Sequence, residues 1–184
     1  MKLKVLSTAI ALTLCSSAAM ADTYQAELGL VYGTIDTDAG DADVTGINGK
    51  YFFNAVDTSN KPLAEAAFLQ EAGSIRAAYG QIDADGDKIK TTAINIDYYF
   101  GDSIFYAGVG AISTDVFGEK NDTWSVTAGV TPVAGWLLTT TYIDDVDYEL
   151  NLQSKYVKQL SGETAINFEL GYAAGVDDAD DTVS

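Results

Sequence analysis

The sequence has no histidine, one cysteine and few basic residues. Histidine is the commonest general base and a frequent zinc ligand, so its absence excludes His-dependent hydrolases and His-containing metal sites. The 10 Lys and Arg against 27 Asp and Glu argue against nucleic acid as a partner, because neutralising phosphates needs basic side chains. Two prolines and two methionines beside 17 glycines and 11 tyrosines suit strands better than packed helices. These features predict an all-β protein, and 184 residues suit one domain.

Long apolar runs are also missing, apart from a short one near the N-terminus. Lys2 and Lys4 precede the apolar run 5–14, and small residues follow as far as Ala21, which is the order of a cleaved secretory signal. We therefore predict a signal peptide over residues 1–21 and a mature domain over residues 22–184. In the alternative interpretation Cys15 carries a lipid, but Leu14 stands where such signals need a small residue.

The predicted mature chain carries a formal charge of −19 and no thiol. An exported protein without disulfides needs another source of stability. A closed hydrogen-bonded sheet or a lipid environment would supply it.

The mature sequence contains about nine stretches of roughly ten residues in which every second residue is apolar or aromatic. This period of two predicts strands with two different faces. Seven stretches are clear: 24–32, 47–53, 75–79, 94–100, 124–130, 150–156 and 166–172. Two more, around 105–113 and 136–143, are predicted strands whose outward face the sequence does not fix.

Ionisable residues within these strands avoid the apolar face. Six lie on the opposite face: Glu27, Lys50, Arg76, Asp97, Lys155 and Glu169. Only Lys90 and Lys158 share the apolar parity, and both lie at predicted strand ends, where a long side chain reaches the interface. Because a charge on the lipid face of a barrel costs about 2–4 kcal/mol at the midplane, this sorting predicts that the six face a lumen. A soluble sandwich with its apolar side inward would show the same alternation.

Aromatic residues end strand after strand on the apolar parity: Tyr24, Tyr32, Phe53, Tyr79, Phe100, Trp124 and Tyr172. Such rings are typical of the girdles at the two membrane interfaces of an outer-membrane barrel. The alternative explanation is the high strand propensity of Tyr and Phe.

The connections between the stretches alternate in length and charge. The odd-numbered ones contain acidic runs that hold 18 of the 27 acids: 36–43, 83–87, 115–122, 144–149 and 177–181. The fourth, sixth and eighth are tight turns near 101–103, 132–135 and 161–163. Outer-membrane barrels have long outer loops and short turns on the other side, so the acidic connections are predicted to be loops outside the cell.

The second connection, 54–73, is long where a short turn is expected. The strand end Tyr-Phe-Phe-Asn at 51–54 and the run Val-Asp-Thr-Ser-Asn-Lys-Pro-Leu-Ala-Glu-Ala-Ala-Phe-Leu at 56–69 resemble the early periplasmic segment of a family of small Gram-negative proteins called putative porins. The opening Tyr-Gln-Ala-Glu-Leu-Gly-Leu-Val-Tyr-Gly at 24–33 is similar to the same family. The resemblance implies an outer-membrane β-barrel and brings no catalytic residues.

The C-terminal end departs from that family pattern. A closing strand should end in an aromatic residue, whereas the acidic run 177–181 leads only into Thr182, Val183 and Ser184. Nine strands is also an odd number, and single-chain bacterial barrels have even numbers. We therefore predict an antiparallel transmembrane β-barrel of about ten strands, within a range of 8 to 12, whose last strand is missing or cut short. Alternatively, one of the nine is not a strand and eight close.

Two patterns could carry chemistry. The run Asp-Ala-Asp-Gly-Asp at 83–87 begins like a calcium loop, but Lys88 and Ile94 stand where the turn glycine and the bidentate glutamate belong, which favours a solvated hairpin. Glu27, Asp97 and Glu169 could form glycosidase-like carboxylate pairs, although charge pairing in a barrel interior explains them more simply. We expect no enzyme activity, no cofactor and no metal site.

The combined pattern predicts a porin-like outer-membrane barrel for passive diffusion of small polar solutes or ions. Its expected partners are outer-membrane lipid and lipopolysaccharide, with the Asp-rich tips as weak sites for bridging divalent cations. Eight strands leave an interior just filled by side chains, so ten give a thin pore. A non-conducting barrel with a structural or interaction role is the main alternative, and a soluble periplasmic barrel that binds an apolar ligand is the third.

Overall fold

The computed structural model describes residues 22–37, 40–84, 86–144, 148–175 and 182–183, so the predicted signal segment lies outside the described residues. These residues form one antiparallel sheet whose strands follow one another in sequence order. The all-β antiparallel class is confirmed. The strands are β1 Thr23–Thr37, β2 Gly40–Asp57, β3 Ser74–Ala84, β4 Asp87–Tyr99, β5 Phe105–Val116, β6 Glu119–Val133, β7 Trp136–Ile143, β8 Tyr148–Ser161, β9 Thr164–Gly175 and β10 Thr182–Val183.

Two short helices lie in the connection between β2 and β3. The 3-10 helix η1 covers Leu63–Glu65, and α1 covers Ala66–Leu69. Pro62 stands just before η1, where its fixed φ of −61° suits the entry to a helix. Across the described ranges, no helix has the length and apolar character needed to cross a membrane.

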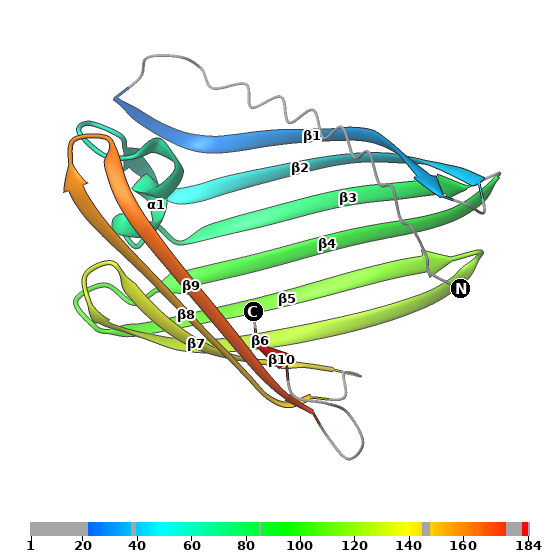
Figure 1. Cartoon of the computed structure of the whole chain (residues 1–184). Helices are drawn as coiled ribbons and strands as arrows, with labels where there is room; N and C mark the ends of the chain where they lie inside the picture. Colours follow the sequence, from blue (N-terminus) through cyan, green and yellow to red (C-terminus); the bar gives the residue numbers. More distant parts are fainter. Residues whose placement is uncertain (1–21, 38–39, 85, 145–147, 176–181, 184) are drawn as a thin grey trace.

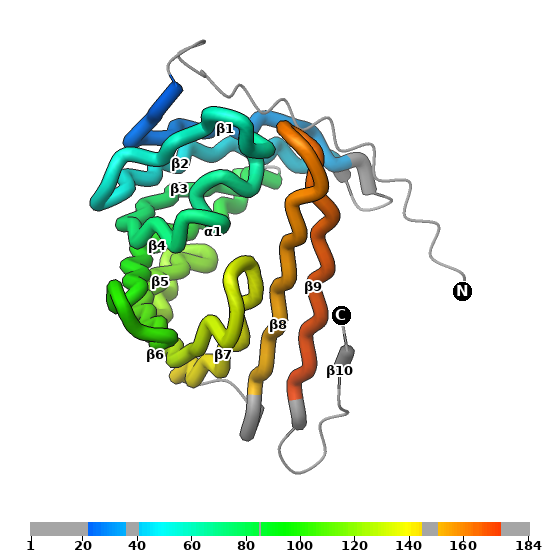
Figure 2. The backbone as a smooth tube through the Cα atoms, turned by 90° about the vertical axis from the view of Figure 1, so that its left-hand side faces the viewer, coloured from blue at the N-terminus to red at the C-terminus, as the bar shows by residue number. Residues whose placement is uncertain are grey.

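The sheet curves around α1, which lies on its concave side (Figures 1 and 2). Within the described residues β1 pairs with β2 and β10 pairs with β9, and no backbone pairing joins these two outer strands. Where we predicted a last strand that is missing or cut short, the described residues form the two-residue β10, opposite Tyr172 and Ala173. The sheet described here is therefore curved but not closed, and closure into a barrel remains a prediction.

Cross-strand pairing settles which residues share a face, because residues directly opposite each other point to the same side. Val109 of β5 lies opposite Ile96 and Val126, and Tyr142 of β7 lies opposite Val126. The two strands whose orientation the sequence left open therefore place Val109 and Tyr142 on the convex, apolar face. Large side chains on that face are exposed throughout the sheet, including Leu28, Ile94, Trp124 and Phe168.

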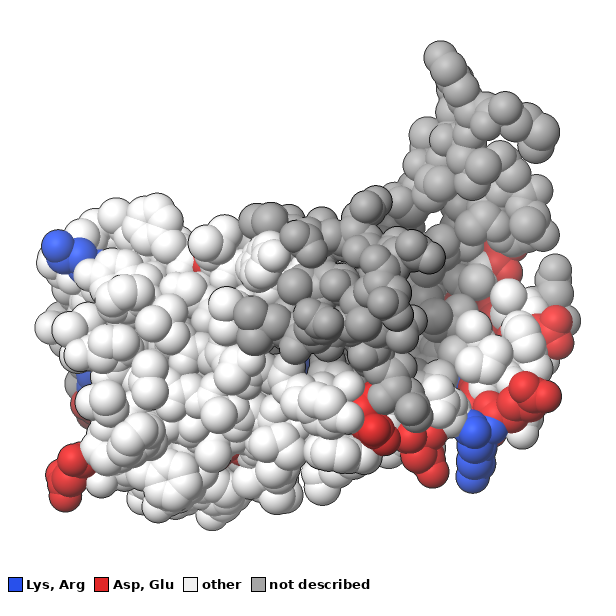
Figure 3. Space-filling view, turned by 90° about the horizontal axis from the view of Figure 1, so that it is seen from below, with Lys and Arg blue, Asp and Glu red and all other residues white. Residues whose placement is uncertain are grey.

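Three acidic connections join long strands in hairpins, β1 to β2, β3 to β4 and β5 to β6, whereas residues 145–147 and 176–181 of the other two lie outside the described residues. β2 has 18 residues and contains Asp41 and Asp43, while β5 and β6 are joined by a turn at Phe117 and Gly118. These strands are longer than the roughly 9–11 residues that a strand needs to span a bilayer. Asp is tolerated in these strand ends because both faces can meet water there. The described acidic hairpins lie at the end of the sheet away from α1 (Figure 1), and the surface that Figure 3 leaves uncovered between the two ends is mostly uncharged.

Two glycines with positive φ, one at each end of the sheet, differ in how closely their surroundings are packed. Gly135, in the turn between β6 and β7, has φ +79° and accepts a 2.7 Å hydrogen bond from the backbone N–H of Val157. Gly118, in the turn between β5 and β6, has φ +94° and would meet nothing within 4 Å if it carried a Cβ atom. We expect Gly118→Ala to lower the free energy of unfolding in detergent by about 1–2 kcal/mol through backbone strain alone.

Gly135→Ala should cost more, because its methyl group would also collide with the Val157 carbonyl. Heat-dependent migration of the folded protein in gel electrophoresis measures both variants. Equal losses would show that the turn between β6 and β7 is not packed against β8.

Candidate functional site

The six ionisable residues singled out from the sequence lie on the concave face. Glu27, Lys50 and Arg76 are direct partners across β1, β2 and β3, and form one row. Asp97 belongs to the next row, where its Oδ2 accepts a 2.8 Å hydrogen bond from the hydroxyl of Ser74. Lys155 and Glu169 are direct partners across β8 and β9, at the other edge of the sheet. The six thus form two groups rather than one cluster.

The wall between these two groups carries no charge in its central part. Register places Gly108, Thr127 and Thr141 in one row, and the hydroxyls of Thr127 and Thr141 are 2.9 Å apart. Close packing accounts for Gly110, because a Cβ atom there would lie 2.5 Å from Asn95 Oδ1. Charge patterns in the sequence do not reveal this wall, because its residues are neutral. The alternation of Thr, Ser and Gly with apolar residues over 123–131 is the pattern from which this neutral wall could have been predicted.

The segment 58–73, called the mouth segment below, folds against the concave face instead of extending away from it. Phe52 and Val56 of β2 and Ala66 of α1 form a fully buried apolar cluster. Tyr24 adds an edge-to-face contact with Phe52 at a ring distance of 5.5 Å. The prediction that Tyr24 lies on the apolar outer face is therefore wrong, because the register shift between Tyr24 and Ala26 turns it toward the concave side. The small side chain of Ala66 permits this close approach. The sequence predicted a long connection here but not that it would occupy the inside of the curve.

Side chains join the mouth segment to β8 and β9 across the concave side. Glu65 Oε2 pairs with Lys155 Nζ at 3.0 Å, and Glu65 Oε1 accepts a 3.1 Å hydrogen bond from Asn167. Gln159 donates to the backbone carbonyl of Asn60. Glu65 is therefore a central residue of the site that no strand pattern could identify, because its partners lie about 100 residues away.

Lys155 is held from several sides. Its ammonium group lies 3.2 Å from Glu169 and 4.8 Å from the centre of the Phe68 ring, in addition to its ion pair with Glu65. Two carboxylates compensate one cation here, so this group supplies no net positive charge.

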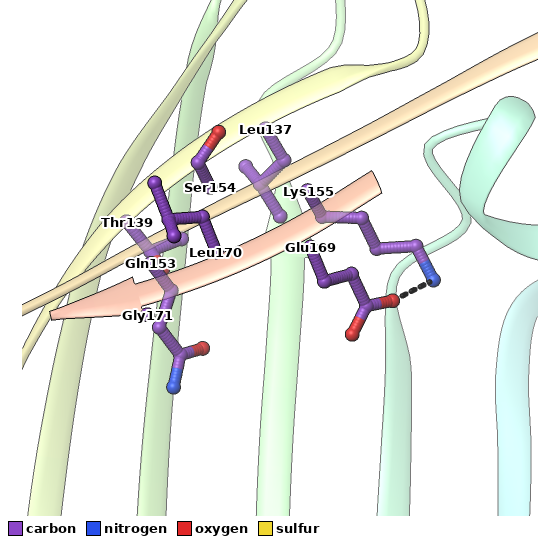
Figure 4. A pocket seen from close by; sticks show the side chains of 8 residues that line it. All are labelled: Leu137, Thr139, Gln153, Ser154, Lys155, Glu169, Leu170 and Gly171. Atoms are coloured by element: carbon purple, nitrogen blue, oxygen red, sulfur yellow. Dashed lines mark ion pairs between the residues drawn. The ribbon is translucent and has the colours of Figure 1, made fainter. Parts of the chain in front are cut away.

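A cavity of about 440 Å³ opens beside this ion pair (Figure 4). Its lining is neutral apart from Lys155 and Glu169: Leu137, Thr139, Gln153, Ser154, Lys155, Glu169, Leu170 and Gly171. Such a lining suits a small polar solute and offers no nucleophile activated by a base.

The calcium-like run forms a hairpin turn. Asp83 accepts a 3.2 Å hydrogen bond from the backbone N–H of Gly86 and pairs with Lys88 at 3.1 Å. Among the residues that the structure describes, no three acidic side chains are placed to hold a metal ion.

The chain is similar to known proteins both in sequence and in structure. A family model described as "putative general bacterial porin" matches residues 1–138. The chain is also similar to a solved structure, the outer membrane protein Omp33 of Acinetobacter baumannii, with 28% sequence identity and a TM-score of 0.66. That match covers 84% of this chain and 66% of Omp33, so this chain spans just under two thirds of its length. No curated protein matches the sequence.

The contacts of Glu65 predict how firmly the mouth segment is held. Ala66 is fully buried, so a cysteine at this position is labelled only when the mouth segment moves away from β2. Cys15 is replaced by serine so that this is the only thiol in the chain. We expect Glu65→Gln to raise the thiol-labelling rate of Ala66→Cys about fivefold, or roughly 1 kcal/mol, because Lys155 keeps only Glu169.

The matched control is Glu163→Gln, the same chemical change at an exposed position in the turn between β8 and β9. It should leave the labelling rate unchanged. Equal rates in both variants would mean that Glu65 does not hold the segment, and Ala67→Cys provides a second reporter if Ala66→Cys folds poorly.

Proposed function

The chain belongs to the family of putative general bacterial porins, and from that premise we propose that it is an outer-membrane barrel for passive diffusion of small polar solutes or ions. The observation that carries the proposal is the separation of the two faces. Apolar and aromatic side chains cover the convex face, while charged and hydroxyl side chains cover the concave face.

The amount of buried apolar material supports lipid as the surroundings of the convex face. In the described part of the chain, Phe52, Val56, Ala66 and Val157 are the only buried hydrophobic residues. Leu28, Phe168 and Leu170 are each at least 60% exposed. Soluble monomers rarely expose contiguous apolar patches of this kind, which argues against the soluble ligand-binding barrel. In a bilayer the same side chains would be covered by acyl chains.

The proposed path is narrow. Small residues on the concave face, such as Gly46 opposite Gly80 and Ala78 opposite Ala93, leave room along β2, β3 and β4. The mouth segment occupies part of the concave side at the end of the sheet away from the acidic hairpins (Figure 1). A path of this kind admits small polar solutes or ions and excludes large ones.

A non-conducting barrel with a structural or interaction role is the second candidate. The observation that favours it is the mouth segment itself, fixed on the concave side by Glu65, Asn60 and their partners. In either case we propose that residues 1–21 direct export, that no reaction is catalysed, and that the acidic hairpins face lipopolysaccharide.

Adjacent alanines on β3 test the proposed path. Ala78 lies on the concave face opposite Asn48, whereas Ala77 lies on the convex face opposite Gly49 and Ile94. In planar bilayers we expect discrete current steps from the protein. Ala78→Trp should reduce the step size at least roughly twofold by filling the path, and Ala77→Trp should leave it unchanged.

The outcomes separate the candidates. Equal effects of the two variants would contradict the assignment of faces. The Glu65→Gln variant is measured as well, because its mouth segment should be held less firmly. If neither protein gives current steps although both fold correctly, the non-conducting barrel is favoured.

A further inference from the structure

We propose that Lys50 and Arg76 form a binding site for the carboxylate group of a permeating solute, so that the path favours small organic anions. The inference rests on the pore function proposed above and names its solute class.

The two cations are direct cross-strand partners on the concave face. Like charges placed opposite each other in a sheet are destabilising unless an opposite charge lies near. Among the described residues, neither side chain has a carboxylate oxygen within the 4.0 Å of an ion pair, whereas Lys61, Lys88 and Lys155 each do. The pair therefore presents two cationic groups that no carboxylate contacts directly in the described structure.

The nearby carboxylates form no direct ion pair with either cation in the described structure. Glu27 is the β1 partner of Lys50, yet no ion pair joins them in the described structure. Asp97, one row away on β4, accepts the hydroxyl hydrogen of Ser74. Lys50 Nζ instead lies 4.6 Å from the centre of the Phe52 ring. A ring face attracts the ammonium group but occupies none of its hydrogen-bond donors as a carboxylate would.

That ring contact also fixes the level of the site. Phe52 is fully buried against Ala66 of α1, so the ammonium group of Lys50 lies at the rim of the mouth segment. A solute that passes along the concave face must pass this rim. Arg76 is exposed, and the row beyond it holds Ala78 opposite Asn48, which leaves room for a ligand.

The chemistry of the two side chains suits a carboxylate. The planar guanidinium group can donate two parallel hydrogen bonds to both oxygens, while the ammonium group adds a second positive charge. The two side chains thus offer a planar pair of donors and a single ammonium group from neighbouring strands.

The acidic hairpins do not decide selectivity at this depth. Asp43 precedes Lys50 by seven residues of β2, which is about 23 Å of extended strand. Screening in salt of physiological strength acts over about 8 Å, so the field of the hairpin tips is weak at the site. Local charge therefore sets the preference.

The test measures the permeability ratio of acetate to potassium from reversal potentials in a potassium acetate gradient. We expect Lys50→Gln with Arg76→Gln to lower this ratio at least about threefold, because two charged donors are lost. Arg76→Lys should keep part of the preference, since it retains the charge without the fork. The control is Lys120→Gln, which removes one positive charge at the hairpin between β5 and β6 and should change nothing.

A second measurement does not depend on conduction. Calorimetric titration of the folded protein in detergent with succinate should show saturable binding that the double variant loses. Inorganic phosphate serves as the competing anion, and binding of phosphate without succinate would overturn the carboxylate assignment.

The two proposals fail separately. Current steps with an unchanged permeability ratio in the double variant would overturn the carboxylate site and leave the pore in place. Absence of steps with succinate binding that depends on Lys50 and Arg76 would overturn the pore and support the site. Absence of both would overturn both.

Discussion

Backbone hydrogen bonds between neighbouring strands hold successive side chains on opposite faces of the sheet, and lipid against one face admits almost no charge. Most features of the molecule follow from these two conditions acting together. Lys50 and Arg76 share a row because β2 and β3 pair in one register, and Ile47 and Tyr79 share the opposite face for the same reason. A slip of one residue would exchange the two sets.

The mouth segment covers the few large apolar side chains that lie on the polar, concave side of the sheet. Phe52 and Val56 face inward on β2, where they would lie beside charged neighbours, and α1 covers them. Glu65 then meets Lys155 and Asn167 of β8 and β9. These contacts connect the two halves of the curved sheet at a place where the described strands are not joined by backbone pairing. Packing, ion pairing and the width of the proposed path thus depend on one short segment.

Sequence patterns predicted those parts that depend on local periodicity. The separation of Lys50, Arg76 and Asp97 from the aromatic face follows from alternation along each strand, and the tight turn at 132–135 follows from its Pro132 and Gly135. The faces of β5 and β7 were not predictable, because Ala and Gly at 107–111 and Thr at 139–141 give no contrast between parities. Their partners on β4 and β6 decide them. The ion pair of Glu65 with Lys155 was not predictable either, because it depends on how the whole sheet curves.

The central claim is that one side of each strand meets acyl chains and the other meets water. Spin labels at Ala93, Ile94, Asn95 and Ile96 of β4, in protein reconstituted into lipid vesicles, test it directly through collision with oxygen, which concentrates in lipid, and with a water-soluble nickel complex. The account predicts that oxygen dominates at Ile94 and Ile96 and the nickel complex at Ala93 and Asn95. The opposite alternation, or strong nickel collision at all four positions, would contradict it.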